Sequence, residues 1–417
     1  MNKTLKLAVA AALLAGASSA NAGIMIPAGD WTLDIGGIVN AYYTSTSYSG
    51  DNAAGTSPLG LGTGAQDTTA NITTGLLPNY LSVSGKTRQN DLDVAFTISI
   101  NPGASTTQSG GQSPQQENRQ AFLTFGDASW GSMKLGKDLG IYASDAILND
   151  MTLLGVGSAA GSLAGNTTTL GRIGTGFMYA DWKSQVAYTS PNFNGFNFTV
   201  GMTQAWNAVG NGSVVAGGAV LNPSTSASSS GRGGSSTAYE GKASYAWTGD
   251  VAGKVWTSFI SQKVEGLSSV VANVATAQGD DRANAWDIGT TVNVAGLGLT
   301  GYYGQGDGIG QTLQLNGGFD ATGKSRDSDQ WYVQATYAIP TGTKLGLSYG
   351  QSTLEGNSGE AFDEVQDSMT VFGAYHPITK HLNLVAEYAV TERDVDNVAA
   401  DAKAKAKTIS LGAILFF

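Results

Sequence analysis

The residue types that most often perform acid–base, nucleophilic or metal chemistry are scarce in this chain of 417 residues. The two histidines, His376 and His381, flank a short turn at Pro377, and the sequence has no cysteine. A nucleophile needs a base beside it, and a histidine pair without a third ligand is a poor metal site. The run Gly304–Gly308 lacks the lysine and helix of a phosphate-binding loop. We therefore predict no catalytic residues, no metal site and no cofactor.

Charged side chains in and around one long apolar segment are better candidates for function. Residues 139–181 are rich in Ile, Leu, Val and Met, yet they also contain Asp145, Asp150 and Arg172. An apolar connection of this length is unfavourable in water, so we expect it to fold back against a wall. The elements that form this wall must be found elsewhere in the chain.

The composition excludes several classes of protein. Only 13% of the residues are charged, whereas an ordinary soluble domain has about 25%. Gly supplies 58 positions, and the formal net charge is -10, which argues against nucleic acid as a partner. Without cysteine there is no disulfide framework, so stability must come from burial and backbone pairing. The low charge indicates that much of the surface contacts something other than water.

The first 22 residues have the pattern of a secretory signal peptide. Lys3 and Lys6 precede an apolar stretch that is too short to span a membrane, and Ala20-Asn21-Ala22 is a small-residue cleavage site. We expect cleavage after Ala22, which leaves residues 23–417 as the mature protein. That protein retains 20 basic and 32 acidic side chains.

Strands of about ten residues, with apolar and polar side chains alternating, recur along the whole mature chain. In the first of them, Trp31, Leu33 and Val39 share one face, and Asn40 and Tyr42 share the other. We count sixteen such segments, at 31–45, 79–87, 91–101, 118–126, 130–138, 182–190, 195–206, 237–248, 252–264, 283–294, 296–305, 329–339, 343–354, 367–376, 381–393 and 405–417. Short and long connections alternate between them.

This pattern predicts an all-β fold, a transmembrane antiparallel up-and-down β-barrel of 16 strands with long outer loops and short periplasmic turns. Hydrocarbon offers no hydrogen-bond partner, so every backbone group must be paired within a closed sheet. A soluble β-sandwich is the alternative, but its outer face would be polar. A barrel of this size is too wide for side chains to fill, and we expect residues 139–181 to enter its water-filled interior.

The most distinctive local sequences are Asn118–Phe122, Trp130–Gly136, Leu148–Met151, Gly171–Gly174, Tyr188–Phe196 and the terminal Phe417. They resemble the general porins of Gram-negative bacteria, which are trimeric 16-stranded outer-membrane channels. The resemblance implies a homotrimer in the outer membrane that lets small hydrophilic solutes and ions diffuse passively. It also implies that residues 139–181 form the pore constriction.

In that family, acids of the constriction loop face basic residues on the opposite wall. By resemblance, Asp150 is the loop acid, with Asp145 as a further one, and Arg119 and Arg172 are the bases. The chain departs from the family at Thr152–Gly157, which lacks a second acid, and Tyr80 stands at a wall position that is usually basic. Such a constriction orders water and orients dipolar solutes.

Strand parity adds one more candidate for the pore. Lys134 alternates with Met133 and Leu135, so it is expected to face the lumen. The net acidity and Asp150 favour cations, whereas the arginines argue for anions.

Three lysines of the last strand, Lys403, Lys405 and Lys407, share parity with its outward apolar face, near the outer end. We expect them either to contact lipopolysaccharide phosphates or to be solvated at the end of a loop.

Other functions stay open at this point. A solute-specific porin for sugars or organic anions would show an aromatic track or a basic ladder, and Tyr42, Trp256, Tyr302 and Tyr332 are expected to face inward on separate strands. An outer-membrane enzyme of the protease or lipase type needs a base that the sequence does not supply. An adhesin or structural barrel would have a plugged lumen.

Overall fold

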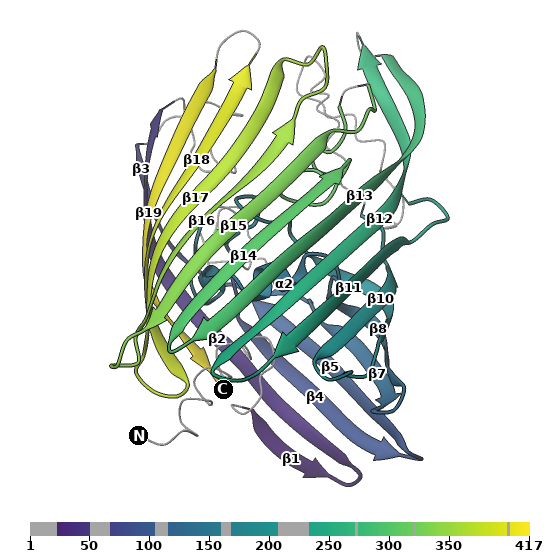
Figure 1. The fold of residues 1–417 in the computed structure, drawn as a ribbon, viewed down its shortest axis with the longest axis vertical. Coiled ribbons are helices and arrows are strands. Elements are labelled where there is room, and N and C mark those ends of the chain that lie inside the picture. Colours follow the sequence, from purple (N-terminus) through teal and green to yellow (C-terminus); the bar gives the residue numbers. More distant parts are fainter. Residues whose placement is uncertain are drawn as a thin grey trace.

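The computed structural model describes residues 23–50, 67–104, 116–159, 168–206, 233–271, 274–320, 322–397 and 401–417. Sixteen antiparallel strands form a closed barrel (Figure 1). They are β2 (Trp31–Gly50), β4 (Tyr80–Gln89), β5 (Leu92–Pro102), β7 (Ala121–Asp127), β8 (Gly131–Leu139), β9 (Trp182–Thr189), β10 (Phe196–Thr203), β11 (Ala238–Trp247), β12 (Val251–Val271), β13 (Val274–Val294), β14 (Leu297–Asp307), β15 (Asp327–Ala338), β16 (Lys344–Glu355), β17 (Phe362–Pro377), β18 (Leu382–Asn397) and β19 (Ala402–Phe416). The predicted fold class and strand number are confirmed.

The two ends of the chain close the ring. β19 pairs with β2 over nearly its whole length, from Ala404 opposite Gly50 to Phe416 opposite Ile38. Gly37 and Phe417 then exchange backbone hydrogen bonds of 2.7 and 3.0 Å. Beyond the end of β19, the short strand β1 (Ile24–Ala28) continues the pairing along β2. No edge of the barrel wall is left open at this seam, which is the requirement for a sheet in hydrocarbon.

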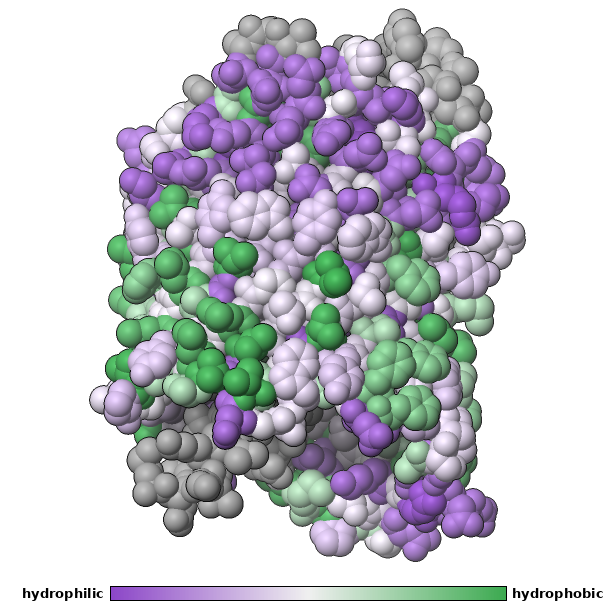
Figure 2. Space-filling model, in the orientation of Figure 1, coloured by the Kyte–Doolittle hydropathy of each residue, from purple (hydrophilic) through white to green (hydrophobic). Residues whose placement is uncertain are grey.

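Side chains alternate between the outside and the inside of the barrel as the two-residue period predicts. On β2, Val39 and Tyr43 are 54% and 48% exposed, whereas Asn40 and Tyr42 are buried. Figure 2 shows hydrophobic residues spread over the middle and lower wall, with hydrophilic residues gathered at the upper end. An apolar outer face below a polar rim is the surface expected of a barrel embedded in lipid.

The strands differ from the prediction mainly at their outer ends. β12 and β13 continue far beyond the expected ends and form one long hairpin, so most of the expected loop at 265–282 is strand. The two short strands β3 (Thr68–Thr73) and β6 (Gln116–Glu117) also add pairing at the rim. These segments mix polar, small and aliphatic residues such as Leu267, so they lack the regular apolar alternation by which the other strands were recognised, but backbone pairing in a hairpin does not require it.

The barrel interior is largely filled on one side by the segment between β8 and β9. It contains the helix α2 (Ser144–Leu148) and the 3-10 helix η2 (Met151–Leu154). Met151 and Val156 pack against wall residues such as Tyr42, and Ile147 packs with Phe177 in a second cluster. In the part of the chain that the structure describes, no helix has the length and apolarity to cross a membrane.

Candidate functional site

The segment between β8 and β9, here called the inner loop (residues 140–181), is held at its start by a carboxylate of β11. Glu240 Oε2 accepts hydrogen bonds from the backbone N–H groups of Ile141 and Tyr142, both at 2.8 Å. Its other oxygen accepts from Lys183 Nζ at 2.5 Å and from Thr203 Oγ1 at 2.7 Å. This buried carboxylate is therefore fully hydrogen-bonded, and it fixes the point where the chain turns into the lumen.

A second carboxylate, on the other side of the ring, holds the middle of the inner loop in the same way. Glu387 of β18 is 4% exposed, and its Oε2 accepts from the N–H groups of Val156 and Gly157, both at 2.8 Å. Tyr375 donates to its other oxygen at 2.7 Å. Gly155 lies so close that a Cβ atom there would overlap the carboxylate. Neither anchor was predicted from the sequence.

Inward-facing aromatic side chains support the inner loop from behind. Tyr42 donates a hydrogen bond to the carbonyl of Leu154 at 2.7 Å, and Tyr332 donates to that of Ala146 at 3.0 Å. Tyr302 stacks on Tyr332 with 5.5 Å between ring centroids, and Trp256 is buried in the same cluster. All four face inward as expected, but the loop covers them. They do not form an aromatic track for solutes.

Asp150 and Arg172 lie beneath the inner loop rather than on its free surface. Asp150 caps η2 by accepting from the Thr152 N–H at 3.2 Å, and burial raises its pKa above the ordinary value. Arg172 is fully buried, 3.7 Å from Asp150, and donates to the carbonyl of Met369 at 3.0 Å. Neither side chain lines the lumen. The family resemblance alone suggested that they do, since a loop has no parity from which a facing direction can be inferred.

Asp145 connects the inner loop to the wall instead of pointing into open space. It forms ion pairs with Lys254 and with Lys242, the latter at 3.2 Å, and Lys242 also donates to Ser144 Oγ at 2.9 Å. Burial alone would raise the pKa of Asp145, but the two lysines outweigh it and hold the pKa below its ordinary value. Asp145 is thus the loop acid that meets basic wall residues, although those residues are not the arginines that we expected.

A cavity of about 1010 Å³ remains between the inner loop and the strands that the loop leaves uncovered. Leu148 and Leu170 of the inner loop, and Leu77 of the connection between β3 and β4, line it on one side. Mainly polar side chains of β4, β5 and β8 to β12, with Phe122 of β7, line it on the other. Of the six residues expected at the constriction, Arg119, Lys134 and Tyr80 line this cavity, whereas Asp145, Asp150 and Arg172 do not.

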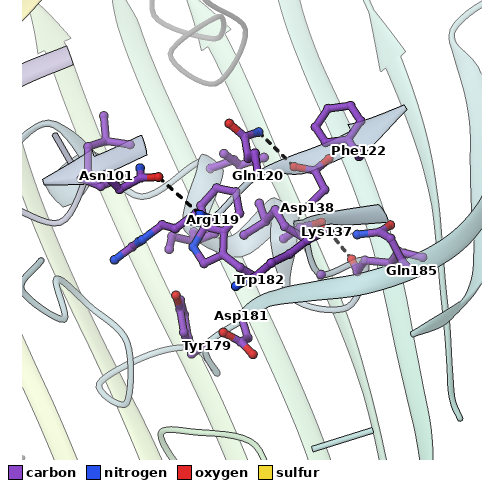
Figure 3. Close-up of a pocket in the computed structure, with 18 of the residues that line it drawn as sticks. Asn101, Arg119, Gln120, Phe122, Lys137, Asp138, Tyr179, Asp181, Trp182 and Gln185 are labelled. Atoms are coloured by element: carbon purple, nitrogen blue, oxygen red, sulfur yellow. Dashed lines mark hydrogen bonds between the residues drawn. The ribbon is translucent and has the colours of Figure 1, made fainter. Parts of the chain in front are cut away.

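Arg119 lies at the centre of a polar cluster in this cavity (Figure 3). It donates to Glu117 at 2.7 Å and to Thr168 Oγ1 of the inner loop at 3.3 Å, and its guanidinium lies 5.8 Å from the ring of Trp182. Asp181, which adopts a left-handed backbone with φ of 58°, lies next to Trp182. Burial raises the pKa of Asp181. The inner loop and the wall therefore meet at Arg119.

Lys134 also faces the cavity, where it pairs with Asp138 and lies 4.8 Å from the ring of Phe122. Its position agrees with strand parity. Asp138 also accepts a hydrogen bond from Gln120 at 3.0 Å.

The cavity lining contains more basic than acidic side chains, and several of these charged side chains were not predicted from the sequence. Five are basic (Arg119, Lys134, Lys137, Lys242 and Lys254) and three are acidic (Glu117, Asp138 and Asp181). Lys242 and Lys254 have the inward parity of Glu240 and Trp256 on their strands, so parity was the available signal.

A second outer connection also contributes to the lumen. Gln314, between β14 and β15, accepts from Lys183 at 2.6 Å and donates to the carbonyl of Tyr179 at 3.0 Å. Its neighbour Leu313 lines the cavity. The sequence predicted only an outer loop at 306–328, because nothing in its composition resembles the apolar inner loop.

The three lysines of the last strand lie on the outside of the barrel near its outer end. Lys403 pairs with Asp394 at 2.6 Å, and Lys405 pairs with Glu392, each directly across β18 and β19. Lys407 is exposed. Among the described residues, no group of three His, Cys, Asp or Glu side chains is placed to hold a metal ion.

Comparison with known proteins agrees with the barrel fold described above. One solved structure with the same fold is the anion-selective porin from Comamonas acidovorans, with 14% sequence identity and a TM-score of 0.57 over 93% of this chain and 100% of that chain. Another is the outer membrane channel DcaP of Acinetobacter baumannii, with 16% identity and a TM-score of 0.63 over 94% of this chain and 99% of that chain. A trimer form of OmpT, an outer membrane protein of Vibrio cholerae, is also similar, with 14% identity and a TM-score of 0.55 over 93% of this chain and 99% of that chain.

A comparison with curated proteins returns no match. A model of the Gram-negative porin family, however, matches residues 8–396, which is nearly the whole chain. The chain belongs to the Gram-negative porin family, and it forms a passive-diffusion channel in the outer membrane.

Proposed function

We propose that this channel passes small hydrophilic solutes and ions with a preference for anions. The observation that carries the proposal is the excess of basic over acidic side chains in the cavity lining. A narrow lumen with low-dielectric walls concentrates ions of the opposite sign. The overall acidity of the chain favoured cations, but acids such as Asp150 lie outside the lining. The similarity to an anion-selective porin agrees with this preference.

Reversal potentials across a planar bilayer in a potassium chloride gradient test the proposal. We expect the potential to lie toward the chloride equilibrium value, and we expect Lys242→Gln with Lys254→Gln to move it toward zero. Lys324→Gln, in an outer connection away from the cavity, is the matched control. A cation preference in the unmodified protein would overturn the proposal.

A homotrimer is the proposed assembly. The exposed large side chains on β4, β5 and β7 are aliphatic (Leu81, Ile98, Ile100 and Leu123), whereas Tyr, Trp and Phe are common among those on β11 to β18. Aromatic belts form where a barrel meets lipid headgroups, so the aliphatic face suits contact with other subunits. β7 to β10 are also short, with 7 to 9 residues, against 21 in β12 and β13. Native mass spectrometry in detergent tests this, and a monomer would contradict it.

The remaining parts of the proposal concern export and lipid contact. Residues 1–22 lie outside the described residues, and we propose that they are removed, so that the mature protein begins at Gly23. N-terminal sequencing of the outer-membrane protein tests this cleavage. We also propose that Lys403, Lys405 and Lys407 contact lipopolysaccharide phosphates, and unchanged lipid retention after replacement of all three by Gln would count against it. The proposal includes no catalysis and no cofactor.

A further inference from the structure

One side of the cavity is apolar and the other is basic. This difference bears on which anions the lumen favours. On one side, Leu148 and Leu170 of the inner loop and Leu77 of the connection before β4 are half-buried, with their covered surface against a buried cluster that includes Ile147 and Phe177. Their remaining surface lines the cavity. Apolar surface in contact with water is unfavourable, and transit of simple inorganic ions does not require it. An apolar face opposite a basic wall is suited to solutes that carry both an apolar part and a negative charge.

The basic and apolar groups lie close together at two places along the lumen. At the first, Arg119 contacts Thr168, and Leu170 follows two residues later. At the second, Lys242 donates to Ser144 at the start of α2, and Leu148 ends the same five-residue helix. At each place, a solute whose carboxylate lies near the basic side chain can place its apolar part against a leucine.

The second place already holds a carboxylate, which shows that its geometry suits one. Asp145 lies between Lys242 and Lys254, and pairs with both. The two lysine side chains remain 29% and 27% exposed and line the cavity. A carboxylate that enters the cavity can therefore contact the same ammonium groups from the open side, with its apolar part on Leu148.

We propose that the lumen contains a transient binding site for amphipathic organic carboxylates, in which a compact apolar body such as a phenyl ring carries one carboxylate. The apolar body lies on Leu148 and Leu170, and the carboxylate passes between Arg119 and the lysine pair. This inference rests on the proposed anion preference and specifies its solute class. It differs from an aromatic track built on Tyr42, Trp256, Tyr302 and Tyr332, because the inner loop covers these four side chains.

Block of the chloride current in planar bilayers tests the inference. The probes are phenylacetate, acetate with the same charge and no ring, and benzyl alcohol with the ring and no charge. We expect phenylacetate to block at concentrations about tenfold lower than either, because covering part of one ring against leucine contributes roughly this factor. Equal block by phenylacetate and acetate would overturn the inference, even if the channel prefers chloride to potassium.

Substitutions separate the two halves of the site. Leu148→Ser with Leu170→Ser should weaken phenylacetate block about tenfold and leave acetate block unchanged, whereas Leu148→Met should retain phenylacetate block. Unchanged phenylacetate block in the serine variant would contradict the inference. A reversal potential that shows no chloride preference would instead refute the proposed function, so the two failures are distinguishable.

Discussion

Removal of the Glu387 carboxylate should release the middle of the inner loop without unfolding the barrel. Glu387 accepts two backbone hydrogen bonds from the loop, at Val156 and Gly157. A hydrogen bond to a charged group contributes about 1.5–3 kcal/mol, so Glu387→Ala should weaken docking of the loop by about 3–6 kcal/mol. At 1.4 kcal/mol for each factor of ten, the ratio of docked to released loop falls by roughly 10² to 10⁴.

Glu387→Gln should have a smaller effect. The amide oxygen can still accept from the loop, and the amide nitrogen can donate to Tyr375, which now donates to Glu387. Neutral hydrogen bonds have about half the strength of charge-assisted ones, so we expect a loss of about 1.5–3 kcal/mol. The barrel strands keep their backbone pairing in both variants.

Single-channel recording measures the effect directly. The unmodified channel should show one narrow conductance level, Glu387→Gln a broader one, and Glu387→Ala several levels or strong open-channel noise. Glu392→Ala is the matched control, because Glu392 lies on the same strand but pairs with Lys405 on the outside of the barrel. If Glu387→Ala gives the same narrow level as the control, the carboxylate does not hold the loop.

Three further outcomes follow from the same geometry. Asp145→Asn should increase the chloride preference in reversal-potential measurements, because it removes the acid that neutralises the lysines of β11 and β12; a decrease would count against this role. As the pH falls toward about 4, the ordinary value for aspartate, Asp181 should be protonated first because its pKa is raised, whereas Asp145 stays ionised because its pKa is lowered. Chloride preference should therefore rise on acidification, and Asp181→Asn should reduce that rise; an identical pH profile would refute the assignment. Gly155→Ala should broaden the conductance level as Glu387→Ala does, since its Cβ would overlap the Glu387 carboxylate, and an unchanged level would show that the loop accommodates the methyl group.

The barrel wall could be predicted from the sequence because strand alternation is a local property. Each of the sixteen strands has one apolar face, and that face must turn outward, to lipid or to a neighbouring subunit, wherever the strand lies. The hairpin of β12 and β13 continues past Lys263 and Arg282, which pair with each other. Aliphatic residues beyond this pair, such as Leu267, do not alternate regularly with polar ones, so the extension was missed.

The lumen was predicted less completely because its residues depend on how loops fold. Lys134 lies on a strand with a defined parity and lines the cavity, whereas Asp150 and Arg172 lie on a loop, where parity gives no facing direction, and the structure places them beneath it. Glu240 and Glu387 are inward acids of β11 and β18. Their role depends on loop N–H groups more than 90 residues away in sequence, which no local pattern reveals.

The central claim is that the inner loop narrows the barrel but leaves a continuous water-filled passage. Recording from the purified protein in a planar bilayer tests this claim most directly. The account predicts stepwise insertion events, each a group of three equal conductance steps, with current carried mainly by chloride. Purified, correctly folded protein that inserts into the bilayer and carries no current would contradict it.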